Sequence, residues 1–409
     1  MQLFEPLTDP LAVLPLPKKL YAYVGVSRNP GNRIRSLGFC FYLIAFFFLP
    51  KMYLGYDTIP QGFRSIAEGM FGFNTCIPLI LLPFNMDQLQ ELFQGLTLCT
   101  KAVSVTEEYK QILIVLNSAI HKYTKHYLIF TIIIIIAMGS STTVGILYIY
   151  NAKDPDEVVS YPLMMEHRMF ALNVHHNLLH CFLHQILLLP AIFTLLIAFT
   201  AKAGTFFGSI RFCSTILEII TLKIVRLQYV NSTAEYTTQL REIIELHQLV
   251  IKCTKILQEI LMNILLAQFT GCVLIWCFFL YCVMISGITA EGITVVAMLV
   301  SFSTETFIFC LLGNELTMKG GQISTAMYAT NWYEQPVKIQ KLIIPIVQQS
   351  QRRIGITAAK FYYIDVNRYG KAGSPTSIIS STNTFFVLRI LPQNMKTAYS
   401  FYLLLKDIF

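Results

Sequence analysis

Residues 260–290 read ILMNILLAQFTGCVLIWCFFLYCVMISGITA, a stretch of 31 positions without an Asp, Glu, Lys or Arg. The hydrocarbon core of a bilayer is about 30 Å thick and is crossed by about 20 apolar helical residues. Because no water reaches the backbone there, we expect a helix. Of all 409 residues, 55% are hydrophobic and 13% are charged, against about 25% charged in ordinary soluble domains. The sequence therefore predicts an all-α, polytopic membrane protein.

Charge-poor windows of the same kind recur along the chain. The predicted membrane spans are residues 36–50, 69–86, 127–150, 181–201, 260–290 and 292–314. Only Glu305 interrupts the last of these. A seventh window, 385–409, is weaker because Arg389, Pro392 and Lys396 break its apolar run. Hydropathy alone therefore predicts six spans.

The distribution of basic residues predicts the orientation, since cytosolic loops carry an excess of Lys and Arg. Five lie in residues 1–35, four in 87–126, seven in 202–259 and eight in 315–382, whereas the intervening loops hold four in all. We therefore expect the N-terminus in the cytosol, which is the reverse of a G-protein-coupled receptor. The N-glycosylation sequon at Asn231 then lies inside the cell, and we expect it to be unmodified.

Two cytosolic regions have helical character. In residues 202–259, apolar positions such as Ile243, Leu246 and Val250 recur at helical spacing, which predicts a helical extension below the membrane. Residues 315–384 read as a cytosolic anchor helix followed by a linker rich in Gly, Ser and Thr. The predicted organisation is a cytosolic segment 1–35, spans one to four over 36–201, the extension 202–259, spans five and six over 260–314, the anchor 315–384 and a final helix 385–409.

Several functional classes find no support in the sequence. It contains no nucleophile elbow, HExxH or P-loop motif, so we expect neither an enzyme nor a cofactor. Basic residues are scattered between apolar spans, which disfavours nucleic-acid binding. The ten cysteines include no C-x-x-C pair, so we expect no disulfide framework or zinc ribbon. His176, His180 and His184 fit one helix face, for which interfacial histidines are a commoner explanation than a zinc site.

Motifs in the last third of the chain carry a family resemblance. The chain reads Gly313-Asn314-Glu315-Leu316, Ala326-Met327-Tyr328, Asn331-Trp332 and, near its end, Lys396-Thr397-Ala398-Tyr399-Ser400-Phe401-Tyr402. This order and spacing, with a cytosolic N-terminus, resembles the insect odorant receptors over most of the chain. The loop between spans four and five is short, so the chain resembles a ligand-tuned subunit and not the co-receptor. Gustatory receptors are the near alternative, although their typical ending, Thr-Tyr-(apolar)-Gln-Phe, is absent.

The resemblance implies an architecture and a function. It implies seven spans in membrane lipid, an extracellular C-terminus and a tetramer with the odorant co-receptor, in the plasma membrane of a sensory neuron dendrite. Such an assembly is a non-selective cation channel that a volatile small molecule opens directly, without a G protein. A secondary transporter is the alternative from another class, but it would more often show internal repeats, and we find none in this chain.

In this resemblance the last helix lines the pore. Leu404 and Ile408 are four residues apart, with Ser400 one turn earlier, so the three share a helix face. Four such faces would form an apolar constriction that blocks ions by dewetting; the alternative is an apolar face packed within its own bundle. Asp407 would attract cations at the outer mouth. The resemblance also implies subunit contacts at Gly313, Asn314, Glu315, Tyr328 and Trp332.

For the ligand we expect a cavity in the outer halves of spans two, three, four and six, where small, hydroxyl and aromatic residues mix. The candidate lining residues are Met70, Phe73, Asn74, Ile77, Ser141, Val144, Gly145, Tyr148, Phe182, Gln185, Leu189, Met298 and Phe302. Ordinary helix packing is the competing explanation for each of them. Glu305, a carboxylate inside a span, either faces a hydrated path or pairs with Lys202 or a hydroxyl; we favour a structural role.

The orientation can be tested with epitope tags on intact cells. Because the basic residues gather on the N-terminal side, an antibody should detect an N-terminal tag only after permeabilisation. A C-terminal tag on the same chain, which seven spans place outside, serves as the matched control. Labelling of the N-terminal tag on unpermeabilised cells, or a glycan on Asn231, would contradict the predicted topology.

Overall fold

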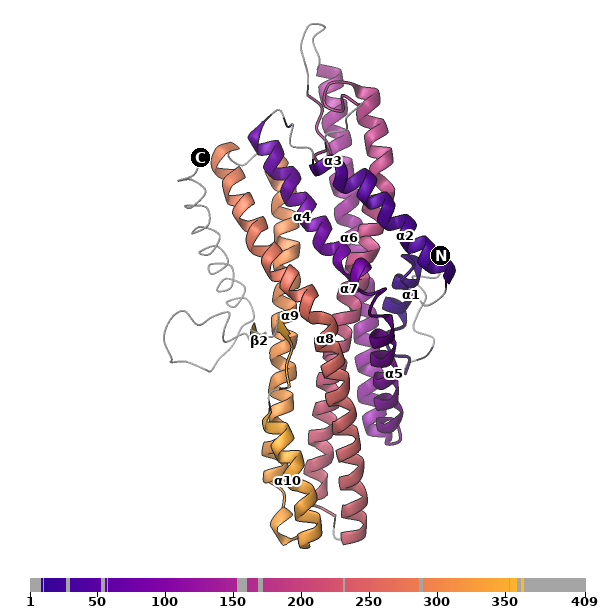
Figure 1. The fold of residues 1–409 in the computed structure, drawn as a ribbon, viewed down its shortest axis with the longest axis vertical. Coiled ribbons are helices and arrows are strands. Elements are labelled where there is room, and N and C mark those ends of the chain that lie inside the picture. The colour runs from indigo at the N-terminus through magenta and orange to yellow at the C-terminus, as the bar shows by residue number, and fades with distance from the viewer. Residues whose placement is uncertain are drawn as a thin grey trace.

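The described part of the chain folds into an elongated helical bundle (Figure 1). The computed structural model describes residues 9, 11–26, 30–52, 56, 58–152, 160–167, 172–230, 232–286, 290–352, 354–358 and 362–363. Long helices run along the long axis of the molecule, and a shorter helix, α10, lies at one end of it. The opposite end is here called the outer end, following the predicted orientation. Apart from one pair of two-residue strands, the regular structure of the described residues is helical, which confirms the predicted all-α class.

The elements follow one another with few long connections. The helices are α1 (Pro15–Tyr23), α2 (Pro30–Leu43), α3 (Leu49–Met52), α4 (Ile59–Leu81), α5 (Met86–Val103), α6 (Glu107–Ala152), α7 (Leu178–Leu227), α8 (Thr233–Ser286), α9 (Ala290–Tyr328) and α10 (Val337–Gln351). A π-helix, η2 (Ile44–Phe48), joins α2 to α3, and a 3-10 turn, η3 (Trp332–Glu334), precedes α10. The strands β1 (Thr357–Ala358) and β2 (Tyr362–Tyr363) pair antiparallel, with Thr357 opposite Tyr363.

The longest helices extend far beyond the thickness of a membrane. α7 has 50 residues and α8 has 54, which at 1.5 Å per residue corresponds to about 75–80 Å, against about 30 Å of hydrocarbon. α7 continues to Leu227 and α8 begins at Thr233, so most of the 202–259 region is helical as predicted. Its apolar face, including Ile243, Leu246 and Val250, is buried in the bundle.

By length and composition, four helices among the described residues are apolar enough to cross a membrane, or five if the bent pair α4 and α5 counts as one span. The helices cover all or most of the six predicted windows. α4, however, begins ten residues before the predicted 69–86 span. The charged residues Arg64 and Glu68 lower the local hydropathy, so the predicted span begins after them. In the structure they belong to α4 and are paired with each other inside the bundle. α4 ends at Leu81, and the chain then turns by 80° into α5.

The first span contains a local widening of the helix. α2, η2 and α3 form one continuous run over residues 30–52, longer than the predicted 36–50. In η2 the Leu49 N–H donates to the Ile44 carbonyl, five residues earlier. In a regular α-helix the ring of Pro50 would clash with the carbonyl of Phe46, so a wider turn accommodates the proline.

Glycines allow two close approaches inside the bundle. A Cβ on Gly208 of α7 would lie 2.5 Å from Cδ2 of Leu14, at the start of α1. This lets α1 pack against α7, with Leu16 and Leu20 buried. A Cβ on Gly72 of α4 would overlap the ring of Phe47 in η2. The two glycines therefore fix how α1 and the first span lie on the bundle.

Some sequence predictions fall where the structure describes no residues. The final helix 385–409, with Ser400, Leu404, Asp407 and Ile408, lies outside the described residues, as do residues 371–384 of the predicted linker and Asn231. These assignments stay predictions, as does the division of the chain into the six predicted regions.

The packing at Gly72 yields a stability test. Gly72→Leu should destabilise the protein by about 1–3 kcal/mol, because the added side chain must displace the buried Phe47 ring. Gly139→Leu on α6 is the matched control, since a Cβ at Gly139 meets nothing within 4 Å. The measurement is the apparent melting temperature of each purified variant in detergent. Equal melting temperatures for the two variants would contradict the described contact.

Candidate ligand-binding site

An apolar cavity lies where α4, α6, α7 and α9 meet, under the segment that joins α6 to α7. Its volume is about 90 Å³. The lining residues are Phe71, Thr131, Ile134, Ile135, Met138, Met164, Met165, Ile192, Leu195, Leu196, Phe199, Met298 and Ser301. Only two of them, Thr131 and Ser301, carry a polar side chain. Because the Thr131 hydroxyl already donates to the carbonyls of Tyr127 and Leu128, the cavity suits an apolar ligand.

The cavity is small in this state but has an adaptable wall. An apolar cavity of about 150 Å³ holds benzene, so 90 Å³ is too little for an aromatic ligand without movement of the lining. Four of the lining residues are methionines, which are unbranched and adjust their shape readily. Binding of a benzene-sized molecule must therefore displace methionine side chains or the backbone that carries them.

Aromatic rings form one wall of the cavity and extend beyond it. The Phe199 ring lies 5.7 Å from the Phe71 ring and 5.5 Å from the Tyr127 ring, between centroids. Phe71 also lies 6.1 Å from Phe302 of α9. On the side of Phe199, the Lys202 ammonium lies 5.3 Å from the ring centroid. These rings connect the cavity to a buried charge.

Lys202 is held in a polar cluster that joins four helices. Its Nζ lies 2.9 Å from Glu305 Oε2, 3.0 Å from Gln268 Oε1 and 3.3 Å from Asn74 Oδ1. The Gln268 side-chain N–H donates to Glu305 at 3.0 Å and to the Thr306 hydroxyl at 3.2 Å. Both charged side chains have no exposed surface. Of the alternatives left open for Glu305, the structure shows the pair with Lys202, and the cluster ties α4, α7, α8 and α9 together.

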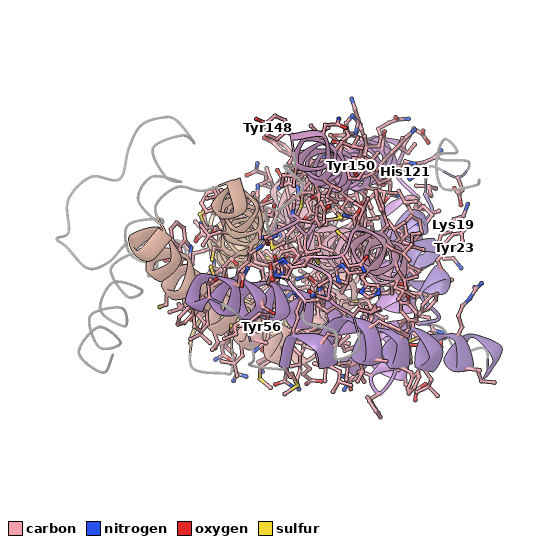
Figure 2. All side chains as sticks on the ribbon, turned by 90° about the horizontal axis from the view of Figure 1, so that it is seen from above. Lys19, Tyr23, Tyr56, His121, Tyr148 and Tyr150 are labelled. Atoms are coloured by element: carbon pink, nitrogen blue, oxygen red, sulfur yellow. The ribbon has the colours of Figure 1, made fainter. Side chains whose placement is uncertain are left out.

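The structure brings together only part of the predicted ligand-binding set. Met298 lines the cavity, and Phe302 and Asn74 adjoin it through the aromatic wall and the Lys202 cluster. Ile77 is buried in the main core, and Met70 packs on a smaller cluster. The remaining predicted residues lie away from the described cavity: Phe73, Ser141, Val144, Gly145, Tyr148, Phe182, Gln185 and Leu189. Figure 2 shows Tyr148 at the periphery of the bundle, in agreement with its exposure of 74%.

The displacement from the predicted site is regular. On α6 the lining residues are 131, 134, 135 and 138, whereas the predicted residues are 141, 144, 145 and 148. On α7 the lining likewise lies ten residues deeper than predicted, which is about 15 Å along a helix. Near the outer ends of both helices, Tyr161 and Leu163 instead pack on Ile146 and Cys181. On α6 and α7 the predicted residues and the cavity residues thus share a helical spacing but differ in depth, whereas Met298 on α9 belongs to both sets.

The cavity residues that sequence reasoning missed fall into two groups. Thr131, Ile134, Ile135 and Met138 repeat the spacing of the predicted stripe, so a search of the whole span for such stripes would have found them. Met164 and Met165 lie in a loop without regular structure. No sequence pattern indicated that this loop enters the bundle.

The other predicted sites are distributed over the bundle. α7 begins at Leu178 with Asn177 as its N-cap, so His176 precedes the helix, and the predicted face of His176, His180 and His184 is wrong. Among the described residues no group of three or more His, Cys, Asp or Glu side chains could hold a metal. Of the predicted interface residues, Glu315 pairs with Arg211, and Tyr328 is exposed beside Trp332. Gly313 and Asn314 precede them on α9.

A second, larger hollow of about 520 Å³ lies between α6, α7 and α9. Its lining includes Val115 and Leu222, which are exposed side chains, and the charged Arg211 and Glu218. It is therefore a groove on the surface of the bundle. The smaller cavity is the better candidate for a small apolar ligand because its walls are almost free of polar groups.

The chain is similar to known receptors in sequence. The family model described as 7tm Odorant receptor matches residues 62–372. The odorant receptor coreceptor of Anopheles gambiae is 24% identical over 106 residues, which cover 26% of this chain and 21% of that protein. Odorant receptor 94a of Drosophila melanogaster is 25% identical over 181 residues, 44% of this chain and 45% of that protein. The similar stretches thus span less than half of these relatives.

The fold is also similar to that of a solved receptor. The structure of the insect olfactory receptor OR5 from Machilis hrabei in complex with eugenol has a TM-score of 0.72 to this chain. The similarity covers 98% of this chain and 100% of the other, at 14% sequence identity. It extends to both ends of the bundle.

The buried pair gives a test by paired substitution. Lys202→Met should destabilise the protein by about 3–5 kcal/mol, because it leaves Glu305 charged and unpaired in an apolar interior. The double variant Lys202→Met, Glu305→Met should recover most of this loss, measured as apparent melting temperature in detergent. Lys110→Met, which breaks the partly exposed pair with Glu107, is the control and should cost at most about 1 kcal/mol. A double variant no more stable than the single one would contradict this account.

Proposed function

Because the chain belongs to the 7tm odorant receptor family, we propose that it is a ligand-tuned subunit of an odorant-gated, non-selective cation channel. The match over residues 62–372 supports the family assignment, and a receptor-like fold over nearly the whole chain agrees with it. The observation that carries the proposal is the small, almost entirely apolar cavity lined by four helices and the loop residues Met164 and Met165. A volatile molecule is small and apolar, so it matches the chemistry of this cavity.

The affinity expected for such a ligand is moderate. An odorant with about 10 non-hydrogen atoms, at roughly 0.8 kcal/mol each, would gain about 8 kcal/mol on binding. This corresponds to a dissociation constant near the micromolar range. OR5 from Machilis hrabei was solved with eugenol, which supports including that compound among the first probes for this chain.

Gating follows if the ligand prefers the open conformation. A ligand shifts a conformational equilibrium only by its difference in affinity for the two states. The 90 Å³ cavity is too small for a benzene-sized ligand, so a conformation with a wider cavity binds better. Widening that moves the Phe199 ring also acts on the Lys202 cluster, since the ammonium lies 5.3 Å from the ring centroid. Because that cluster joins α4, α7, α8 and α9, the movement reaches four helices together.

The pore would be formed by several subunits. We place the gate at Ser400, Leu404 and Ile408 of the last helix, with Asp407 at the outer mouth. The channel opens when water enters the ring that these residues form with their counterparts in the other subunits. The partner is the odorant co-receptor, a choice supported by the similarity to co-receptors of several insects. Subunit contacts would involve Gly313, Asn314, Glu315, Tyr328 and Trp332. No G protein takes part, and the site of action is the plasma membrane of a sensory neuron dendrite.

Current recordings test the proposal against its alternatives. In cells that express this chain with the co-receptor, an odorant panel should evoke a cation current. The same panel should not evoke this current in cells that express either chain alone. Substrate uptake by this chain alone, without such a current, would instead support a secondary transporter. Responses to sugars or bitter compounds in place of volatiles would support a gustatory receptor.

Two tryptophan substitutions on α7 test the location of the ligand. Ile192→Trp should abolish the odorant-evoked current, because Ile192 is buried in the cavity wall and an indole would fill the space. Leu189→Trp is the matched control, since Leu189 is 55% exposed and does not line the cavity. Currents are normalised to the amount of protein at the cell surface, so that a loss of ligand binding is distinguished from a loss of folded protein. Loss of response in Leu189→Trp with retention in Ile192→Trp would favour the shallower, sequence-predicted site.

A further inference from the structure

Residues 161–167, here called the cap segment, enter the bundle instead of lying on its surface. All of them except Pro162 are buried. Met164 and Met165 are each 7% exposed and line the cavity, while the Tyr161 N–H donates to the His175 carbonyl at 2.7 Å. The segment has no helix or strand to hold its backbone. Other contacts must therefore fix its position.

Those contacts come from a buried group of charges at the outer end of the bundle, here called the outer ionic cluster. It consists of Lys51, Arg64, Glu68, Glu166 and His175. Glu68 of α4 is its centre. Its carboxylate accepts from Lys51 Nζ at 2.6 Å, from Arg64 Nε at 2.9 Å and from the backbone N–H of Glu166 at 2.8 Å. One carboxylate thus joins α3, α4 and the cap segment.

The two cations of the cluster also hold the cap backbone. Lys51 Nζ donates to the Glu166 carbonyl at 2.7 Å, and Arg64 Nη2 donates to the Leu163 carbonyl at 3.0 Å. The Glu166 side chain lies 2.8 Å from His175 Nε2, just before α7. The cap segment is therefore held on both sides of Met164 and Met165, mainly through main-chain atoms that most side-chain substitutions in the segment leave in place.

Four of the five cluster residues carry charges that balance one another. Lys51, Arg64, Glu68 and Glu166 are each at most 5% exposed, so two cations face two carboxylates with little access to water. Burial and the nearby Lys51 ammonium keep the pKa of His167 well below its usual range, so this neighbouring ring adds no third positive charge. Loss of one carboxylate would leave a buried cation unpaired, which strongly disfavours the closed arrangement.

We propose that the outer ionic cluster positions the cap segment as a closed roof over the cavity, and that Met164 and Met165 thereby limit the size of the ligand. The ligand part of this inference rests on the proposed function, whereas the closed roof does not. Glu68 acts here as a positioning residue, since it touches the cap backbone and not the cavity.

The roof can be tested without any odorant by cysteine labelling from outside. The chain with Met165→Cys is expressed in cells and exposed to a membrane-impermeant, cationic methanethiosulfonate reagent. The unsubstituted chain provides the background from native cysteines. Because Met165 is buried under an intact cluster, labelling should be slow. Adding Glu68→Gln should speed it at least about tenfold, as expected when one partner of a buried ion pair is lost.

Further variants separate charge from shape. Glu68→Asp keeps the charge and should restore slow labelling, whereas a role of side-chain volume alone would favour Gln, which matches Glu in size. Glu166→Gln keeps the main-chain contacts and should speed labelling less than Glu68→Gln does. Glu305→Gln is the matched control, since it removes an equally buried carboxylate whose partners are Lys202 and Gln268. It should speed the labelling of Met165→Cys less than Glu68→Gln does, because neither of these two partners belongs to the cap segment.

The outcomes distinguish the roof from the receptor function. Fast labelling in the parent Met165→Cys chain, or equal labelling rates with and without Glu68→Gln, would overturn the closed roof even if odorant currents are present. If the roof holds, the Met164→Ala variant is expressed with the co-receptor, and currents are recorded for the alcohols from butanol to decanol. The alcohol that evokes the largest current should be longer for this variant than for the unsubstituted chain, because the smaller side chain leaves more room. An unshifted series would overturn the size limit, and absence of any current would count against the proposed function while the labelling result stands.

Discussion

No water reaches the interior of a membrane-spanning bundle, so every charge there must find its partner within the protein. This constraint explains the two polar clusters of the structure. Lys202 and Glu305 meet in the middle of the bundle with Gln268 and Asn74 completing their hydrogen bonds. The outer ionic cluster does the same for Glu68 and its partners near the outer end. Most other contacts between the described spans are apolar and weakly directional, so these clusters help to specify which helices lie together.

The candidate cavity has contacts with both clusters, one on each side. Met164 and Met165 connect it to the outer ionic cluster, and Phe199 connects it to Lys202. Its walls are adaptable methionines and rings, while both ends are tied by charges with fixed partners. In the proposed function, a ligand that widens this cavity acts on the roof at one end or on the Lys202 cluster, which joins four helices, at the other.

The long helices connect the cavity to distant parts of the bundle. α7 and α8 extend about 75–80 Å, and the helices pack against one another far from the cavity through buried Ile243, Leu246 and Val250. Arg211 follows Lys202 on α7 and pairs with Glu315 of α9, where the proposed subunit contacts begin.

The all-α class and the approximate positions of the helices follow from the amino-acid sequence, because they depend on local hydropathy and helical spacing. For Glu305 the sequence offers Lys202 as one of several partners, since a buried charge needs an opposite one, and it indicates stripes of residues spaced to face a cavity. The depth of the described cavity follows only from the folded chain, where Tyr161 and Leu163 pack on Ile146 and Cys181 near the outer ends of α6 and α7. Only the tertiary structure shows that Arg64 and Glu68 belong to a helix, because their charges are cancelled by partners distant in the chain. Contacts such as Lys51 with Glu166, 115 residues apart, leave no periodic trace in a sequence, and only the folded chain reveals them.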